Sequence, residues 1–88
     1  MNNHDILNLL DTATLSALFK LYNIKYSSIA VRLRCTKANI TYKQQTDSWK
    51  DYELQIVLEI LQQYGLEITE LILINRMVNT AKKRMWNT

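Results

Sequence analysis

Residues that form tight backbone turns are almost absent from this chain, which contains one glycine and no proline among its 88 residues. Tight hairpins, phosphate-cradling loops and the Rossmann turn all need glycine where the backbone dihedral φ is positive. The sequence therefore excludes most all-β folds and the nucleotide-binding enzymes. A chain of this length supports one hydrophobic core, and its 48% hydrophobic and 22% charged residues are ordinary for a globular protein. We predict a single all-α domain over residues 1–88.

Side chains for metal binding or nucleophilic catalysis are scarce. The single histidine, His4, and the single cysteine, Cys35, cannot supply a zinc ligand set or a nucleophile with its base and orienting group. We predict no enzymatic activity, no cofactor, no metal site and no small-molecule ligand. The first residues lack a signal-peptide pattern, and the longest strongly apolar run, Leu71 to Ile74, falls far short of the about 20 residues that span a membrane. A cytoplasmic protein without a membrane segment is expected.

Hydrophobic spacing of three and four residues predicts helices along almost the whole chain. These helices form a compact bundle of five or six, with a core over about residues 12–72, and whether Asp11 separates the first two is left open. The predicted segments are Asp5–Leu10, Thr12–Tyr22, Ser27–Leu33, Thr36 to about Gln44, Trp49–Gly65 and about Thr69 to Arg84.

Capping residues set several of the predicted helix boundaries. Thr36 supplies a hydroxyl N-cap, and Ser48 followed by Asp51 resembles a capping box. The polar run from Gln44 to Ser48 is predicted to be a loop. The helix after it should follow the apolar stripe Tyr52, Ile56, Ile60 and Tyr64, and end at Gly65 in a left-handed conformation.

Charge is segregated along the chain. Seven cations and one anion lie between Lys20 and Lys50, whereas five anions and no cation lie between Asp51 and Glu70. The last segment is basic again, with Arg76 and the run Lys82–Arg84. Such a division is expected when one face of a protein meets a polyanion and another face avoids it.

The segment from Asn23 to Thr41, NIKYSSIAVRLRCTKANIT, resembles the helix-turn-helix of the Cro-like phage-repressor family, also called the xenobiotic-response-element type. Downstream, YGLEITELI (Tyr64 to Ile72) is similar to the stretch that joins the fourth and fifth helices of the family, so the resemblance covers about Leu15 to Ile72. It implies a lambda repressor-like fold whose second motif helix reads DNA. The matching positions are Ile29, Ala30, Leu33, Thr36 and Ile40.

Three positions depart from the pattern of that family. Arg34 stands where glycine is usual in the turn, and Lys25 stands where a Thr or Ser cap is usual. Lys43 occupies the place of a hydrophobic residue that closes the recognition helix. Either Tyr42 supplies that apolar contact instead, or it faces outward with the other groove-reading residues.

The predicted nucleic-acid contacts follow from turning Ile40 inward. The side chains then presented to base edges suit groove reading, with lysine for guanine, glutamine for adenine and methyl groups for thymine. The predicted base-contacting residues are Thr36, Lys37, Ala38, Thr41, Tyr42 and Gln45. Neutralising about six phosphates predicts a salt slope near −5. The predicted phosphate-contacting residues are Lys25, Tyr26, Ser27, Arg32, Arg34, Asn39, Lys43 and Lys50.

The last predicted helix, about residues 69–84, carries more apolar surface than one small core can cover. Its three-four spacing is typical of helices that pair, and a two-fold dimer would hold its recognition helices about 34 Å apart. The alternative is that this helix only caps its own monomer. The predicted dimer interface consists of Leu71, Ile74, Val78, Ala81 and Met85.

Together these features predict a sequence-specific, double-stranded DNA-binding transcriptional regulator of phage or mobile-element type. It acts as a repressor and as a homodimer, with one recognition helix per major groove. The alternative is a protein-interaction module, such as an antirepressor or an inhibitor of a host or phage protein, which keeps the scaffold but binds a regulatory protein partner.

Overall fold

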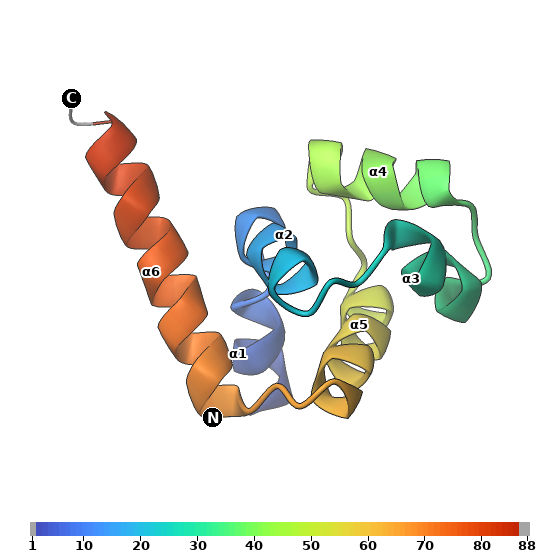
Figure 1. The fold of residues 1–88 in the computed structure, drawn as a ribbon, viewed down its shortest axis with the longest axis horizontal. Coiled ribbons are helices and arrows are strands. Elements are labelled where there is room, and N and C mark those ends of the chain that lie inside the picture. Colours follow the sequence, from blue (N-terminus) through green and yellow to red (C-terminus); the bar gives the residue numbers. More distant parts are fainter. Residues whose placement is uncertain (1, 87–88) are drawn as a thin grey trace.

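Six α-helices make up the described chain in the computed structural model, which covers residues 2–86, with side chains through Ala81 (Figure 1). The described residues contain no strand, so the predicted all-α class is confirmed. The helices are α1 (Asn3–Asn8), α2 (Thr12–Leu21), α3 (Tyr26–Leu33), α4 (Lys37–Thr46), α5 (Asp51–Gln63) and α6 (Ile68–Trp86).

Asp11 separates α1 from α2, which answers the question that the sequence left open. Its backbone is extended, and its side-chain Oδ1 accepts a hydrogen bond of 2.8 Å from the Thr14 N–H. This is an N-cap, in which a carboxylate satisfies a backbone donor that the first turn of a helix leaves unpaired. The core therefore begins before residue 12, because Leu7 and Leu10 are buried together with the residues of the later helices.

Four of the helices end in a left-handed residue. Gly65 does so after α5, as predicted, with φ at 108°, and Leu66 N–H reaches back to Leu61 O at 3.0 Å. The same hydrogen bond, from the residue after the left-handed one to the carbonyl five positions earlier, closes α2, α3 and α4. In these three helices the left-handed residue carries a side chain. Their left-handed residues are Asn23, Arg34 and Asp47. This explains how a chain with one glycine makes its turns, at a cost of about 1 kcal/mol for each such residue.

Glycine at two of these positions is expected to stabilise the protein. Arg34→Gly and Asp47→Gly should each raise the free energy of unfolding by about 0.5–1 kcal/mol, since the left-handed strain exceeds the added entropy of the unfolded chain. Urea titration followed by circular dichroism measures both. The control is Thr80→Gly, an exposed site within α6, where glycine should destabilise by a similar amount. Destabilisation by Arg34→Gly would contradict this account.

Buried side chains from all six helices form one core, to which α1 contributes Leu7. α3 packs on α4 and α5, α2 packs on α4 and α6, and α1 packs on α5. The side chains with no exposed surface include Leu15, Leu18, Ile29, Ile40, Val57, Leu61 and Leu71.

The apolar stripe predicted for α5 is partly wrong. Tyr52 and Tyr64 are 63% and 51% exposed, whereas Leu54 and Leu58 occupy the buried face instead. The tyrosines satisfy the helical spacing, but more than half of the surface of each remains exposed at the rim of the core. The helix also begins at Asp51 rather than Trp49, so Ser48 is not its N-cap.

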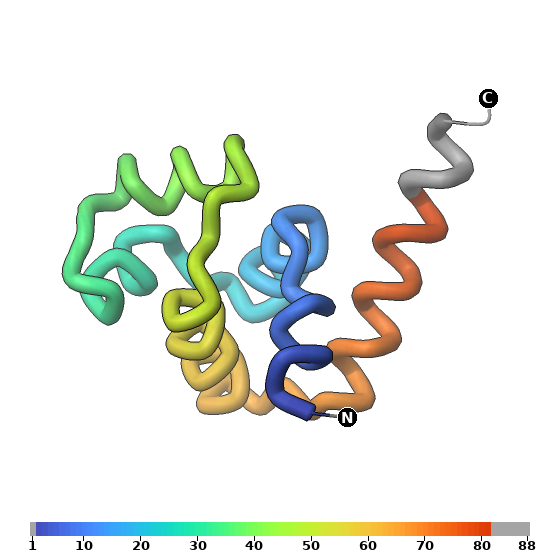
Figure 2. The backbone as a smooth tube through the Cα atoms, turned by 180° about the vertical axis from the view of Figure 1, so that it is seen from behind, coloured from blue at the N-terminus to red at the C-terminus, as the bar shows by residue number. Residues whose placement is uncertain are grey.

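Only the first half of α6 packs against the other helices. Figures 1 and 2 show the coloured part of α6 diverging from them towards its C-terminal end. Leu71 has no exposed surface and belongs to the core of its own chain. Leu71 is therefore corrected from the predicted dimer interface to the monomer core, while Ile74 and Val78 are half-buried and Ala81 is exposed. The side chain of Met85 lies outside the described residues. None of the helices in the described part is both long enough and apolar enough to cross a membrane.

One polar side chain joins α6 to the start of α2. Asn75 Nδ2 donates a hydrogen bond of 2.8 Å to Leu9 O and lies 3.3 Å from the Oγ1 of Thr14, a residue without exposed surface. Buried polar groups of this kind are stable only when their partners are present. Asn75 therefore fixes where α6 leaves the core.

Removing this anchor is expected to loosen α6. Asn75→Leu keeps the branched shape of the side chain but leaves Leu9 O without its donor, which should lower the free energy of unfolding by about 1–2 kcal/mol. Chemical denaturation measures the change, and hydrogen exchange should show faster opening of α6. Thr80→Ala, which removes only a bond from Thr80 Oγ1 to Arg76 O on the exposed side of the helix, is the control. Equal stability of the two variants would contradict the anchoring role.

Candidate nucleic-acid interface

The α3–α4 pair presents the residues that the sequence singled out. A connection of three residues joins the two helices, and Ala30, 4% exposed, lies where they meet. Ile40 of α4 is completely buried and Leu33 is half-buried. A small residue at the contact allows the helix axes to approach closely. This packing holds α4 at the edge of the molecule, with one side free (Figure 1).

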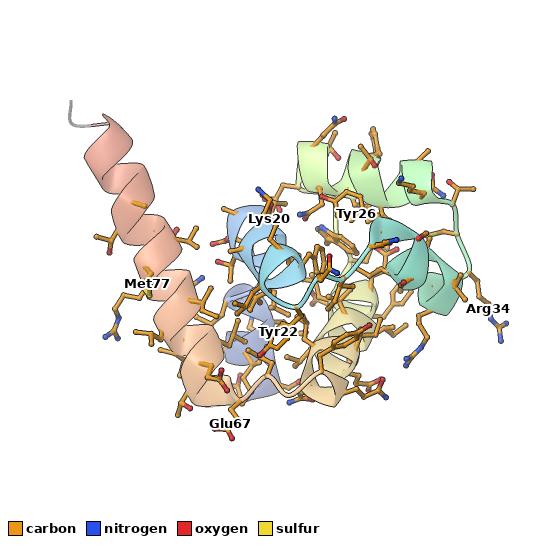
Figure 3. The ribbon with its side chains drawn as sticks, viewed as in Figure 1. Lys20, Tyr22, Tyr26, Arg34, Glu67 and Met77 are labelled. Atoms are coloured by element: carbon orange, nitrogen blue, oxygen red, sulfur yellow. The ribbon has the colours of Figure 1, made fainter. Side chains whose placement is uncertain are left out.

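The turn between α3 and α4 accommodates an arginine. Arg34 adopts a left-handed conformation with φ at 56° and ψ at 44°, and Cys35 N–H donates to Ala30 O at 3.0 Å. The conformation that favours glycine is thus retained with a cationic side chain in it. Arg34 is exposed and extends away from the helices in Figure 3.

Thr36 is the N-cap of α4, as predicted. Its Oγ1 accepts a hydrogen bond of 3.2 Å from the Asn39 N–H. Because the cap fixes where the helix begins, it also fixes which side chains share a face with Ile40. The predicted end near Gln44 is wrong, since α4 continues to Thr46 and includes part of the expected loop.

The outer face of α4 is polar and accessible. Lys37, Ala38 and Gln45 are exposed, as is Thr36 ahead of them, and Tyr42 is 61% exposed. Tyr42 therefore does not replace the missing core residue. Thr41 is half-buried, with its Oγ1 donating to Lys37 O at 3.3 Å. All six predicted base-contacting residues thus lie on or beside one exposed helix face.

Lys43 lies on the inner side of α4, where the sequence placed it among phosphate contacts. Its Nζ is 2.8 Å from Glu53 Oε2 and 3.0 Å from Glu53 Oε1, and the two side chains are only 16% and 8% exposed. A lysine engaged in this way is not available to a ligand. Lys43 is therefore corrected from a phosphate contact to a structural ion pair that joins α4 to α5.

The Glu53 carboxylate binds two groups, the Lys43 ammonium and a backbone N–H. Besides Lys43, its Oε1 accepts a hydrogen bond of 2.9 Å from the backbone N–H of Lys50 at the start of α5. Burial alone would raise the pKa of Glu53, but the hydrogen bonds and positive charge of Lys43 and Lys50 outweigh it, so that the pKa lies below its usual range. The carboxylate therefore remains charged inside the fold.

Gln44 completes the inner anchoring of α4. Its Nε2 donates to Thr12 O at 3.2 Å, and its Oε1 accepts from Trp49 Nε1 at 2.9 Å. Neither Gln44 nor Glu53 was among the functional residues predicted from the sequence. The one available signal was that Glu53 follows Lys50 by three residues, the spacing at which a glutamate side chain caps a helix start.

The remaining candidate phosphate contacts are distributed around the α3–α4 pair. Tyr26 is half-buried, with its ring edge-on to Phe19 at a centroid distance of 6.0 Å. Arg32 Nη1 donates to Gln63 Oε1 at 3.3 Å and stays exposed. The other predicted contacts, all exposed, are Lys25, Ser27, Arg34, Asn39 and Lys50.

Two acidic residues, Glu67 and Glu70, lie together at the start of α6. Glu67 lies beside the start of α6, far from α4 in Figure 3. Burial raises the pKa of the nearby Tyr22 hydroxyl, and the negative charges of Glu70 and Glu67 raise it further. The charge segregation along the sequence is therefore only partly a segregation in space, because Asp47, Asp51 and Glu53 lie at the end of α4 and the start of α5.

The chain matches no protein-family model, and no curated protein or solved structure shows significant similarity to it. Within the part of the chain that the structure describes, no three His, Cys, Asp or Glu side chains form a group that could hold a metal ion. The assignment of function therefore rests on the geometry and charge of the α3–α4 pair.

Proposed function

We propose that this protein is a sequence-specific regulator that binds double-stranded DNA as a homodimer and inserts one α4 into each major groove that it reads. The observation that carries the proposal is the two-sidedness of α4. Ile40, Lys43 and Gln44 hold its inner side to three other parts of the fold, while its outer side is exposed and polar. A single α-helix of this kind fits the major groove of B-DNA.

The outer side chains match the chemistry of base edges. Lys37 suits the N7 and O6 acceptors of guanine, and Gln45 suits the paired donor and acceptor of adenine. Ala38 and the Thr41 methyl group offer apolar contacts to a thymine methyl. Repression follows if the bound site overlaps a promoter, as in the phage regulators that the α3–α4 segment resembles. Such a role also fits a cytoplasmic protein.

Contacts to the phosphate backbone would come from residues flanking this face. The start of α3 is exposed at Ser27 and next to Lys25, and helix N-termini attract anions. Arg34 and Lys50 lie at the turns before and after α4. Such contacts set the register of the protein on the duplex without reading its sequence.

The experiment begins with selection of bound sites from a random duplex pool, followed by equilibrium binding to the best site and to a shuffled one. Lys37→Ala is expected to reduce the discrimination between the two by about 1–3 kcal/mol, because a base contact is lost. Arg76→Ala removes an exposed cation from α6 and should leave the discrimination unchanged. If Lys37→Ala binds both duplexes as the unmodified protein does, α4 is not the reading helix.

A second candidate function is a protein-interaction module, such as an antirepressor or inhibitor. It is favoured by apolar side chains exposed outside α4, since Val31 is 76% and Leu21 is 62% exposed. Such side chains are typical of protein contacts when they cluster. A regulatory protein partner that copurifies in stoichiometric amount, with no DNA retained at physiological salt, would select this function over the first.

A further inference from the structure

The outward face of α6 carries an apolar strip. Leu73 and Met77 are 56% and 61% exposed, and Ala81, four residues further on, is also exposed. Residues spaced by four lie on one side of a helix. The opposite side holds Leu71, which has no exposed surface, and Asn75, which bonds to Leu9. The strip therefore points away from the monomer core.

The two ends of α6 carry opposite charge. Glu67 and Glu70 are exposed at its start, Arg76 lies in the middle, and the sequence places Lys82, Lys83 and Arg84 near its end. Two copies packed in parallel through this strip would set like charges side by side. An antiparallel pair would instead set the acidic start of each helix beside the basic end of the other, which is favourable.

We infer that the partner of this strip is a second copy of the chain, packed antiparallel, with the two-fold axis beside Met77. Met77 then contacts the partner's Met77, and Leu73 contacts the partner's Ala81. The apolar strip is symmetric about Met77, since Leu73 and Ala81 each lie four residues from it. A two-fold interface needs such self-complementarity. This pairing gives the homodimer of the proposed function a defined geometry.

The antiparallel arrangement has a consequence for DNA binding. Figure 1 shows α4 at the end of the molecule towards which the C-terminus of α6 runs. Reversing α6 in the second copy therefore puts its α4 at the opposite end of the dimer. The two recognition faces would then hold two separate DNA segments, and not adjacent grooves about 34 Å apart on one duplex. This bridging rests on the DNA binding proposed above, whereas the helix pairing does not.

Cysteine crosslinking tests the pairing. In a Cys35→Ala background, Leu73→Cys and Ala81→Cys are prepared as separate proteins and oxidised alone and as an equimolar mixture. The antiparallel pair predicts disulfide-linked dimer in the mixture and none above background in either variant alone. Crosslinking of each variant with itself would show a parallel pair, and a monomer in every sample would show that nothing of this chain covers the strip. Either result overturns the inference.

Bridging is tested separately. A duplex carrying the selected site is fixed to beads, and capture of a second, labelled duplex is measured with the unmodified protein and with Met77→Glu, which places a charge at the two-fold axis. The unmodified protein should capture the second duplex, and Met77→Glu should lose capture while still binding the first. Crosslinking in the antiparallel pattern without DNA binding would overturn the proposed function and leave the pairing intact. DNA binding without capture would overturn the bridging.

Discussion

Affinity for duplex DNA is expected to fall about 10³-fold when monovalent salt rises from about 50 to 200 mM. Six cations between residues 20 and 50 stay exposed when Lys43 is set aside. Five of them can each displace about one counterion from a phosphate, and Lys37 in the groove brings a sixth charge to the same duplex. Their slope of log affinity against log salt is near −5, as the sequence predicted. Fluorescence anisotropy on a short duplex carrying the selected site measures it. The six cations are Lys20, Lys25, Arg32, Arg34, Lys37 and Lys50.

Single substitutions measure how much each cation contributes to this slope. Lys50→Gln should make the slope shallower by about 1, since one phosphate contact is lost. Arg76→Gln, on α6, removes the same charge from an exposed site outside the α3–α4 pair and should leave the slope as it was. An affinity that hardly changes between the two salt concentrations would contradict a phosphate-driven interface.

Local rules predicted which side of α4 faces outward because they act over three or four residues. Thr36 caps α4 through the Asn39 N–H, and Ile40, four positions after the cap, is fully buried. Once a cap and one buried residue are known, the helical period decides which side chains point outward. These two features could therefore be identified without coordinates.

The inner side of α4 could not be predicted in the same way. Lys43 pairs with Glu53, ten residues away on another helix, and Gln44 bonds to Thr12, which lies 32 residues earlier. No local pattern distinguishes a lysine that pairs inside the fold from one that faces a phosphate. Only the packing of α4 on α5 brings these groups together.

The function of apolar residues in α6 was ambiguous for a related reason. A spacing of three and four identifies an apolar stripe, but a stripe that covers its own core has the same spacing as one that covers a partner. Leu71 belongs to the first kind, since it has no exposed surface, whereas Met77 is 61% exposed and does not cover the core of its own chain. The dimer interface predicted from the sequence combined residues of both faces, since Leu71 is buried and Ala81 is exposed.

Loss of the Glu53 carboxylate is expected to be the most destabilising of the single substitutions considered. Glu53→Ala should lower the free energy of unfolding by about 3 kcal/mol, since it leaves a half-buried lysine without its counterion and the Lys50 N–H without an acceptor. Urea denaturation at pH 7 measures the loss. Glu59→Ala, an exposed carboxylate on the same helix, is the control and should change stability little.

The same carboxylate should make stability depend on pH. Because its pKa is lowered in the folded state, the charged form contributes stability above the ordinary glutamate pKa of about 4.3, and this contribution is lost as pH falls through the lower folded value. Denaturation between about pH 5 and pH 3 should therefore show a steeper loss of stability in the unmodified protein than in Glu53→Gln. Parallel curves for the two proteins would mean that Lys43 and Glu53 do not act as an ion pair, and Lys43 would then be free to contact a phosphate.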